Sequence, residues 1–422
     1  MSRVSRQSIS VIAWRNLWRN RRRTLLTLSS ITFGVFLSVM FTAMQDRNWS
    51  DMIDLAAKLG GGHVTISHLE YRETPSLKKS ISDASPLAQA ALRQRSVARV
   101  VQRISGPVML NTASESYGAS FIAYDPAQED ASTLSFLDSD ALLAGRMFAN
   151  DNEKGIILGY KLAENLNAEL DNRIVYTMTD KNGDIVSGLA RLIGTIKTGA
   201  PNLDARLSLL PLSTVREIVA YDSDEVTQLA VFIEDQRDSE AVAMLLDSVI
   251  GTQDLAVLPW NISQPDLAAF IAVELGGTRF MSAFIALLVA AGIFNTLFVS
   301  VMERMREFGI LMAIGFTPLK LFSLVMMESL WLALVGLLGA ALLTTGPYLY
   351  LASTGIDTSA MFADQGSMDV AGVAMSTTLK VGIFPESLAV IAIAAIIATL
   401  LAGFYPAWRA GTVEPVDAVK LL

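Results

Sequence analysis

Four long runs of apolar residues dominate the pattern of hydrophobic and polar positions along this chain. They cover residues 24–44, 280–302, 321–350 and 384–405. An α-helix needs about 20 apolar residues to cross a hydrocarbon core of about 30 Å, so each run predicts a membrane-spanning helix. The first run is longer than the core of a secretory signal peptide and lacks a clean small-residue cleavage site. We therefore expect it to be an uncleaved anchor.

The segment between the first two runs, residues 45–279, has the pattern of an α+β domain. Short apolar stretches bounded by turn residues predict strands, and they occur at 63–67, 97–110, 120–124, 155–158, 173–179, 189–197 and 228–234. Stretches with helical periodicity separate them, at 161–170, 212–220 and 239–250. Lys181 to Asp184 predicts a hairpin turn between its flanking strands. The segment is long enough to hold two subdomains.

The segment before the first run, residues 1–23, is basic and amphipathic. Helical spacing places four apolar residues on one side of it, Ile9, Ile12, Ala13 and Leu17. Trp14 and Trp18 are one turn apart beside Arg15, and tryptophan favours the headgroup level of a bilayer. We therefore expect an interfacial helix, carrying Trp14, Arg15 and Trp18, that bends into the first spanning helix. A cluster of arginines that only sets the topology is the alternative interpretation.

Composition agrees with a membrane protein, and the charges predict its orientation. The 422 residues are 52% hydrophobic, with a mean hydropathy of +0.42. Basic residues gather before the first run and in the loop 303–320, whereas the loop 351–383 has only Lys380. The positive-inside rule then places the N-terminus, the loop 303–320 and the tail 406–422 in the cytoplasm. Residues 45–279, with 32 acidic and 20 basic residues, are expected outside.

The pattern and the charges together predict the fold class. We expect an α-helical membrane protein with four transmembrane helices and a large α+β extracytoplasmic domain between helices 1 and 2.

The sequence offers little catalytic chemistry. There is no cysteine, so thiol nucleophiles and thiolate metal sites are excluded. His63 and His68 would point to opposite faces of a strand, so no metal site is expected. The sequence contains no G-x-x-x-x-G-K-[ST], G-x-S-x-G or H-E-x-x-H motif, and we expect no catalytic or cofactor-binding residue in this chain. A membrane-anchored sensor or enzyme would need a catalytic cluster in residues 45–279, and none is visible.

Two polar residues fall inside the spanning runs. Glu328 is eight positions after Lys320, a depth that permits it to reach toward the cytoplasmic side, so we expect a structural role rather than a proton relay. Asn295 is expected to bond to a neighbouring helix. Gly336 and Gly339 predict a face of close helix packing.

The candidate functional site is the loop between the second and third runs. Charged residues open it, and Ile310, Leu311 and Ile314 follow at helical spacing, which predicts a short helix with a narrow apolar face. Gly315 is expected to end this helix, and Thr317 with Pro318 to begin the next. Such a helix is shaped to insert into a partner protein. An ordinary solvated loop between membrane helices is the alternative interpretation.

The chain resembles the permease family of ABC transporters that includes MacB, FtsX and the lipoprotein-release subunits LolC and LolE. The matching stretches include Ala13 to Leu17, Glu303 to Gly315, and Tyr405 to Ala410 with Glu414 to Ala418. The outer segment resembles the MacB-like periplasmic core in several short motifs, at 145–146, 155–159, 194–199 and 210–212. Each motif is loose alone, but their order is specific. Met312, Phe316 and Leu170 to Asn172 depart from the family pattern.

The resemblance implies a mechanism and partners. A separate ATPase dimer, which carries the ATP and Mg²⁺, would bind the coupling residues Glu303, Arg304, Arg306, Glu307, Gly309, Ile310, Leu311, Ala313, Ile314 and Gly315. A second copy or paralogue, the lipid bilayer, and a periplasmic carrier or adaptor are implied as further partners, and nucleic acid is not. The implied location is the bacterial inner membrane. Release of lipoprotein or similar amphipathic cargo is the favoured function. MacB-like efflux, disfavoured without a fused ATPase, and FtsX-like activation of a cell-wall hydrolase are the alternatives.

Overall fold

The computed structural model describes residues 3–250, 254–358, 369–370, 373–374 and 378–412. The chain divides into two compact units. The helical unit comprises residues 1–48, 273–357 and 378–422, and the mixed unit comprises residues 49–272 and 358–377. Glu414 to Ala418, one of the family-like stretches, lies outside the described residues.

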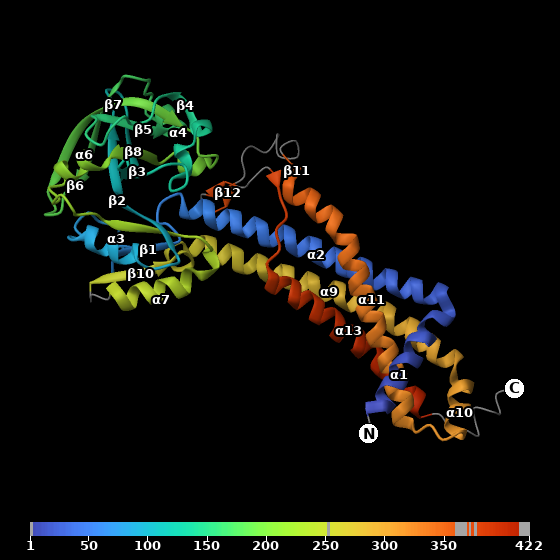
Figure 1. The fold of residues 1–422 in the computed structure, drawn as a ribbon. Helices are drawn as coiled ribbons and strands as arrows, with labels where there is room; N and C mark the ends of the chain where they lie inside the picture. The colour runs from blue at the N-terminus through green and yellow to red at the C-terminus, as the bar shows by residue number, and fades with distance from the viewer. Residues whose placement is uncertain (1–2, 251–253, 359–368, 371–372, 375–377, 413–422) are drawn as a thin grey trace. The chain divides into compact units, whose positions relative to one another are not determined.

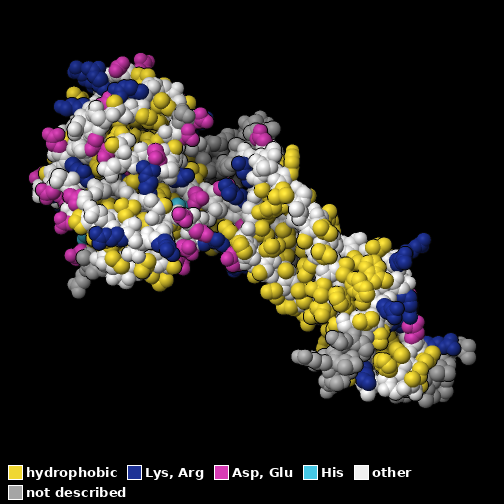
Figure 2. All heavy atoms as spheres, viewed as in Figure 1, with side chains coloured by type: hydrophobic (Ala, Val, Ile, Leu, Met, Phe, Trp, Pro, Cys, Tyr) yellow, Lys and Arg dark blue, Asp and Glu magenta, His cyan; other side chains and the backbone are white. Residues whose placement is uncertain are grey.

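The helical unit is built from long apolar helices (Figure 1). Its elements are α1 (Arg3–Leu17), the 3₁₀ turn η1 (Trp18–Asn20), α2 (Arg21–Ala57), α9 (Pro265–Glu303), α10 (Met305–Ala313), α11 (Pro318–Ser353) and α13 (Pro385–Gly411), with the short pair β11 (Ile356–Asp357) and β14 (Thr378–Leu379). Four of the described helices are long and apolar enough to cross a membrane, as predicted. Figure 2 shows hydrophobic side chains covering their outer surface. α13 continues through Pro406 to Gly411, beyond the predicted end of the span at residue 405.

Glycines bring α2 and α11 together. A Cβ atom on Gly336 would lie 2.5 Å from Ile31 Cγ2, and one on Gly339 would lie 2.7 Å from Thr32 Oγ1. The Thr32 hydroxyl donates a hydrogen bond to the Gly336 carbonyl at 3.2 Å. The close-packing face predicted from these two glycines is therefore confirmed. Asn295, in contrast, is exposed and makes no hydrogen bond with any side chain or backbone group of the described residues, so its expected bond to a neighbouring helix is not found within this chain.

The first helix bends into the second at η1, as predicted, and packs on α11. Ile9 and Ala13 are buried against Leu324. Ile12 was expected on the same side but is 39% exposed. It lies about 100° from Ala13 around the helix, because each residue advances the helix by that angle. The buried stripe is therefore narrower than the apolar pattern indicates.

The mixed unit is a ten-stranded sheet with short helices around it. Its strands are β1 (Val64–His68), β2 (Val97–Asn111), β3 (Ser116–Tyr124), β4 (Leu142–Gly145), β5 (Gly155–Gly159), β6 (Arg173–Thr179), β7 (Ile185–Ile196), β8 (Leu207–Pro211), β9 (Gln228–Ile233) and β10 (Leu255–Pro259). Its helices are α3 (Ala84–Leu92), α4 (Tyr160–Asn165), α5 (Pro201–Asp204), α6 (Leu212–Ile218), α7 (Ser239–Ile250) and α8 (Trp260–Ser263). The 3₁₀ turns η2 (Ser135–Leu137), η3 (Ser139–Ala141) and η4 (Gln236–Asp238) and the pair β12 (Asp369–Val370) with β13 (Val373–Ala374) complete it.

One long strand divides this unit into two subdomains. Neighbouring strands follow the order β10-β1-β9-β2-β3-β8-β5-β7-β4, and β6 pairs with both β2 and β7. Strands β2, β3, β8, β5, β7 and β6 therefore close into a ring. The first half of β2 instead pairs with β9 up to Arg103, and its second half pairs with β3 from Ile104 onward. The two predicted subdomains are thus an open sheet and a small barrel that share β2.

A buried ion pair lies where β2 passes from the sheet to the barrel. The side chains of Arg103 and Glu129 are 0% and 1% exposed, and Arg103 donates to both carboxylate oxygens, at 2.9 and 2.5 Å. Arg103 also donates to the Thr133 carbonyl at 2.9 Å and to the Gly60 carbonyl. Gly60 follows the C-terminal end of α2. The hydrogen bond from Arg103 to its carbonyl therefore connects that end with strand β2 of the sheet. Its guanidinium lies 5.8 Å from the Phe232 ring centre.

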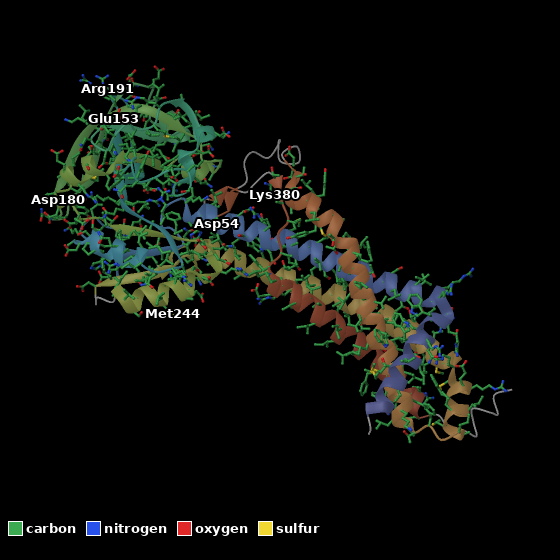
Figure 3. The ribbon with its side chains drawn as sticks, viewed as in Figure 1. Asp54, Glu153, Asp180, Arg191, Met244 and Lys380 are labelled. Atoms are coloured by element: carbon green, nitrogen blue, oxygen red, sulfur yellow. The ribbon has the colours of Figure 1, made fainter. Side chains whose placement is uncertain are left out.

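The predicted hairpin turn and His63 both have structural roles in the mixed unit. Lys181 to Asp184 forms the hairpin turn between β6 and β7. The carboxylate of Asp180, a residue labelled in Figure 3, accepts three backbone N–H groups of this turn. His63 is buried and its Nε2 lies 3.0 Å from Asp54 Oδ1. The backbone N–H of Ile233 donates to the other ring nitrogen of His63. His63 therefore joins the end of α2 to β9 by hydrogen bonds.

Candidate functional site

The loop between α9 and α11 contains the predicted short helix, α10. It occupies Met305–Ala313. The backbone N–H of Phe316 donates to the Leu311 carbonyl at 3.0 Å, and that of Gly315 donates to the Met312 carbonyl at 3.0 Å. These two bonds define a Schellman motif, which needs a left-handed residue after the helix. Gly315 supplies it, with φ of +106°. Thr317 and Pro318 then begin α11, as predicted.

The face that α10 presents differs from the predicted one. Ile310 is 48% exposed and Ile314 is 75% exposed, but Leu311 is half-buried in a cluster with Val301, Leu321 and other residues of this chain. Phe308, which the sequence did not single out, is fully buried in the same cluster. The exposed apolar anchor therefore consists of Ile310 and Ile314, one helical turn apart. Phe308 and Leu311 hold α10 against its own helices.

Ion pairs join α10 to η1 and the end of α9 to the start of α2. Both carboxylate oxygens of Glu307 accept hydrogen bonds from Arg19 at 2.8 Å. Arg23 donates to Glu303, the last residue of α9. The partners are 288 and 280 positions apart in the chain, so nothing in the local sequence indicates the pairing. Because Arg19 lies in η1 and Arg23 in the first turn of α2, the pairs connect the bend between α1 and α2 with both sides of the turn between α9 and α10.

A third connection is more deeply buried. Arg304 donates to the two oxygens of Glu328 at 3.0 and 3.1 Å, and Asn16 donates to the same carboxylate at 3.0 Å. Arg304 also lies 3.3 Å from Glu307 and 5.1 Å from the Phe308 ring centre. The carboxylate of Glu328 is thus neutralised where it lies, and the predicted structural role is consistent with these contacts.

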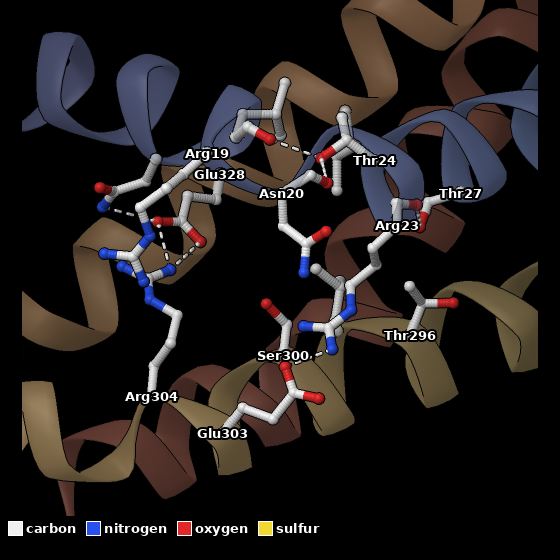
Figure 4. A pocket seen from close by; sticks show the side chains of 14 residues that line it. Arg19, Asn20, Arg23, Thr24, Thr27, Thr296, Ser300, Glu303, Arg304 and Glu328 are labelled. Atoms are coloured by element: carbon white, nitrogen blue, oxygen red, sulfur yellow. Dashed lines mark hydrogen bonds and ion pairs between the residues drawn. The ribbon is translucent and has the colours of Figure 1, made fainter.

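A polar cavity of about 250 Å³ lies among these residues (Figure 4). Its polar lining consists of Asn16, Arg19, Asn20, Arg23, Thr24, Thr27, Thr296, Ser300, Glu303, Arg304 and Glu328. Each arginine that lines the cavity is paired with a carboxylate of the described residues. The cavity therefore has no surplus positive charge that would attract an anion, and we regard it as part of the connection between the helices.

The environment of Glu307 changes its acidity. Partial burial raises the pKa of this carboxyl, but the hydrogen bonds from Arg19 and Arg304 lower it by more, so that the pKa lies below the ordinary value of 4.5. Glu307 is therefore ionised near neutral pH, and its contacts with the two arginines are charge-assisted.

The remaining predicted site residues lie either on α10 or at the interfacial helix. Gly309 is buried, whereas Ala313 and Arg306 are exposed, and Arg306 forms no ion pair with any described residue. Trp14 and Trp18 are 38% and 36% exposed.

The aromatic rings at α1 form a short row. The Trp14 ring centre lies 5.8 Å from that of Trp18 and 5.0 Å from that of Trp331 on α11, and Arg15 beside them is exposed. This exposed aromatic and basic surface is the one predicted for headgroup contact.

Comparisons with known proteins agree with this architecture. The model of the MacB-like periplasmic core domain matches residues 24–249, and that of the FtsX-like permease C-terminal region matches residues 279–415. The chain is 24% identical over 330 residues to the lipoprotein-releasing system transmembrane protein LolC of Neisseria meningitidis, covering 75% of this chain and 74% of that protein. It is 25% identical over 344 residues to an uncharacterized ABC transporter permease of Methanocaldococcus jannaschii, covering 78% and 80%.

A further relative is longer than this chain. The macrolide export ATP-binding/permease protein MacB of Nitrosomonas europaea is 24% identical over 432 residues, covering 97% of this chain and 58% of that protein. The four long apolar helices and the matched periplasmic domain make this a multi-pass membrane protein with a periplasmic or extracellular domain between its first two spans. The chain belongs to the FtsX-like permeases with a MacB-like periplasmic core domain, the non-catalytic permeases of ABC transporters.

Proposed function

We propose that this chain pairs with a second permease and, driven by a separate ATPase dimer, extracts a lipoprotein or similarly amphipathic cargo from the outer leaflet of the bacterial inner membrane. The N-terminus, α10 and the C-terminal tail would lie in the cytoplasm, where the ATPase acts. The asymmetry of basic residues between the loops supports this orientation.

The observation that carries the proposal is the exposed pair Ile310 and Ile314 on a helix whose opposite face is packed against this chain. A Schellman motif ends α10, a buried phenylalanine anchors it, and ion pairs at its start connect it with η1 and α11. Two isoleucines held in water without a partner lower solubility and give nothing to the fold. A binding surface gives them a role, since buried aliphatic anchors dominate interfaces of this kind.

The same contacts suggest how a push on α10 would reach the membrane. Arg304 connects the start of α10 with Glu328 of α11, which also accepts from Asn16 of α1, and Arg19 connects α10 with η1, the turn that leads into α2. A displacement of α10 by the ATPase would therefore move two spanning helices through charged groups that are already paired.

The cargo is proposed from the relatives. LolC is named for lipoprotein release, and the apolar spans with few ionisable groups suit lipid-like cargo better than ions. MacB-like efflux is the second candidate, because the MacB relative matches 97% of this chain. Identification of the ATPase and of any periplasmic protein that copurifies with the chain would separate the two.

The test replaces both exposed isoleucines by aspartate. Burying a large aliphatic side chain contributes ~1.5–3 kcal/mol, so Ile310→Asp with Ile314→Asp should weaken ATPase binding by on the order of 100-fold. Arg306→Ala, an exposed charge on the same helix, is the matched control and should weaken it by less than about fivefold.

Copurification of the ATPase with tagged permease is the measurement, together with export. Leu311→Asp is a poor probe, because Leu311 is half-buried against this chain's own helices and its loss would also disturb the fold. If the double variant keeps full ATPase association while Arg306→Ala loses it, the contact is electrostatic and the apolar-anchor model fails.

A further inference from the structure

Three arginines at the bend between α1 and α2 have no carboxylate partner among the described residues. Arg15 lies in the last turn of α1, and Arg21 and Arg22 lie in the first turn of α2. All three side chains are exposed. The first 45 residues of the chain contain no acidic residue, so the segment that carries these bend arginines supplies no charge to neutralise them.

The carboxylates at this end of the helical unit are already engaged. Each of the three that the structure describes there accepts hydrogen bonds from an arginine other than the bend arginines. These pairs are Arg19 with Glu307, Arg23 with Glu303, and Arg304 with Glu328. Figure 2 shows Lys and Arg side chains gathered at this end, where α10 lies. The bend arginines therefore need a counter-charge that the described residues do not supply.

The bend arginines lie where α2 leaves the hydrocarbon core of the bilayer. Leu25 and Leu26, one turn further along α2, are 54% and 70% exposed, and Phe33 continues the exposed apolar face. Exposed apolar side chains on a membrane-spanning helix face the lipid chains. One helical turn rises about 5.4 Å, and arginine extends its charged head from an apolar stem toward water. The guanidinium groups of Arg21 and Arg22 therefore lie at the level of the lipid headgroups.

Aromatic side chains indicate the same interface independently. Trp14 and Trp18 are exposed on either side of Arg15 in the chain. Tyr405 and Trp408 are exposed near the end of α13, with ring centres 5.9 Å apart, and that end packs beside α10. Tryptophan and tyrosine gather at the headgroup level of a bilayer. This end of the helical unit therefore combines an aromatic belt with unpaired positive charge.

An anionic phospholipid suits both features. Its phosphate accepts charge-assisted hydrogen bonds from arginine, and its acyl chains cover the exposed leucines below. Free phosphate has no chain, and a zwitterionic lipid offsets its phosphate with a cation of its own. The first turn of α2 has three arginines and no acidic residue, and positive charge at a helix N-terminus is unfavourable. A bound anion relieves that cost and the repulsion between Arg21 and Arg22.

We propose that Arg15, Arg21 and Arg22 bind the phosphate groups of anionic phospholipids in the adjacent leaflet, with the acyl chains along Leu25 and Leu26. The leaflet is the cytoplasmic one in the orientation of the proposed function. The site goes beyond that function, because it requires neither the ATPase nor the cargo. Arginines that only set the topology would give no preference for anionic lipid at this position.

The test uses the full chain in vesicles of phosphatidylcholine and phosphatidylglycerol. Because the chain has no cysteine, Leu26→Cys carries a single bimane fluorophore next to the proposed site. Leu401→Cys on α13 is the comparison position, since Leu401 is 68% exposed and about 12 Å along the helix from Arg409. Brominated acyl chains quench a fluorophore that they touch, so brominating one lipid class at a time measures which lipid occupies each position.

We expect phosphatidylglycerol to be preferred about fivefold at Leu26→Cys and by less than about twofold at Leu401→Cys. Excess inorganic phosphate, added at the ionic strength of a chloride control, should leave the preference at Leu26→Cys unchanged. Loss of the preference in phosphate alone would show a site for the free anion and would overturn the assignment to lipid.

Two sets of substitutions locate the site. The first replaces the three bend arginines, as Arg15→Gln, Arg21→Gln and Arg22→Gln. The charge-matched control replaces three other basic side chains of the same end, as Arg306→Gln, Lys320→Gln and Arg409→Gln. The first set should bring the preference at Leu26→Cys close to one, and the control should keep most of it. Arg22→Gln alone should about halve the preference and serves if the triple variant fails to insert.

Three results would overturn the proposal. Equal occupancy of the Leu26→Cys position by the two lipids would leave the arginines a topological role only. A preference that persists without the bend arginines would place the site elsewhere. Equal losses in both triple variants would show a general potential of this end and no built site. Loss of ATPase copurification with the lipid preference intact would count against the proposed function and leave the lipid site standing.

Discussion

Arg103→Met should destabilise the mixed unit far more than any exposed charge in the same strand. The substitution leaves the Glu129 carboxylate, 1% exposed, without its cation, and it removes the donor for two backbone carbonyls, those of Gly60 and Thr133. Breaking a buried ion pair by removing one partner costs ~3–5 kcal/mol, because the other charge remains buried.

The matched control lies four residues earlier in β2. Arg99 pairs with Asp130, but their side chains are 36% and 59% exposed. Solvent screens such a pair, so Arg99→Met should cost about 1 kcal/mol or less. Replacing both buried partners, Arg103→Met with Glu129→Leu, removes the stranded charge and should recover most of the loss, since apolar replacement of a buried pair is often neutral.

Hydrogen exchange of the full chain in detergent measures the effect. Amides of β2 and β9 should exchange roughly 10²- to 10³-fold faster in Arg103→Met than in the parent, and no more than about fivefold faster in Arg99→Met. The double replacement should return them close to the parent rate. Equal effects of Arg103→Met and Arg99→Met would show that the buried pair gives no special stability, and the reasoning from burial would be refuted.

Three further predictions address packing, acidity and topology. Gly336→Ala should lower the stability of the detergent-solubilised chain to heat by about 1–3 kcal/mol, because the added methyl group overpacks against Ile31. Gly292→Ala, with open space around its Cβ position, is the control and should be neutral or slightly stabilising. Equal melting temperatures of the two variants would contradict the close α2–α11 contact. Because the pKa of Glu307 is lowered in the folded chain, its contribution to stability is present above about 4.5 and lost as the pH falls below that value. The protection factors of the α10 amides, which correct for the intrinsic pH dependence of exchange, should therefore fall on acidification, and Glu307→Gln should abolish that dependence. Cysteine at Ser187 should react with an impermeant reagent in intact cells and cysteine at Ala313 should not, and the reverse pattern would invert the proposed orientation.

The membrane spans were predictable because a bilayer imposes a length that few other structures share. The strand β6 and the helix α7 were also predicted with their exact bounds, and β1, β2, β5 and β9 to within one residue at each end, since turn residues mark their ends. β4, β8 and β10 were missed, because a run of four or five residues such as Leu207–Pro211 is too short for periodicity to distinguish strand from loop. The short helix α3 was missed for a similar reason, because its alanines make no clear pattern of hydrophobic and polar positions.

The site was predictable where the signal is local and unpredictable where it is not. Gly315 indicates the end of α10 from the sequence alone, because few other residues adopt positive φ. The pairing of Arg19 with Glu307 depends on how separate helices pack. No local sequence pattern predicts which helices pack together, so the ion pair could not be predicted. The half-burial of Leu311 follows from Phe308 on the neighbouring position of the helix surface, which turns the apolar face toward the chain's own core.

The docking of α1 has a consequence for how the chain is made. Asn16 bonds to Glu328, 312 positions later, and Ala13 is buried against Leu324 on the same helix. A ribosome adds ~5–20 residues per second, so α1 exists for about 15 to 60 s before its partner is synthesised. During that interval its apolar stripe and tryptophans have only the membrane surface to cover them. The amphipathic character of α1 thus first holds the nascent chain at the membrane surface. After synthesis, the same apolar stripe packs against α11 in the folded protein.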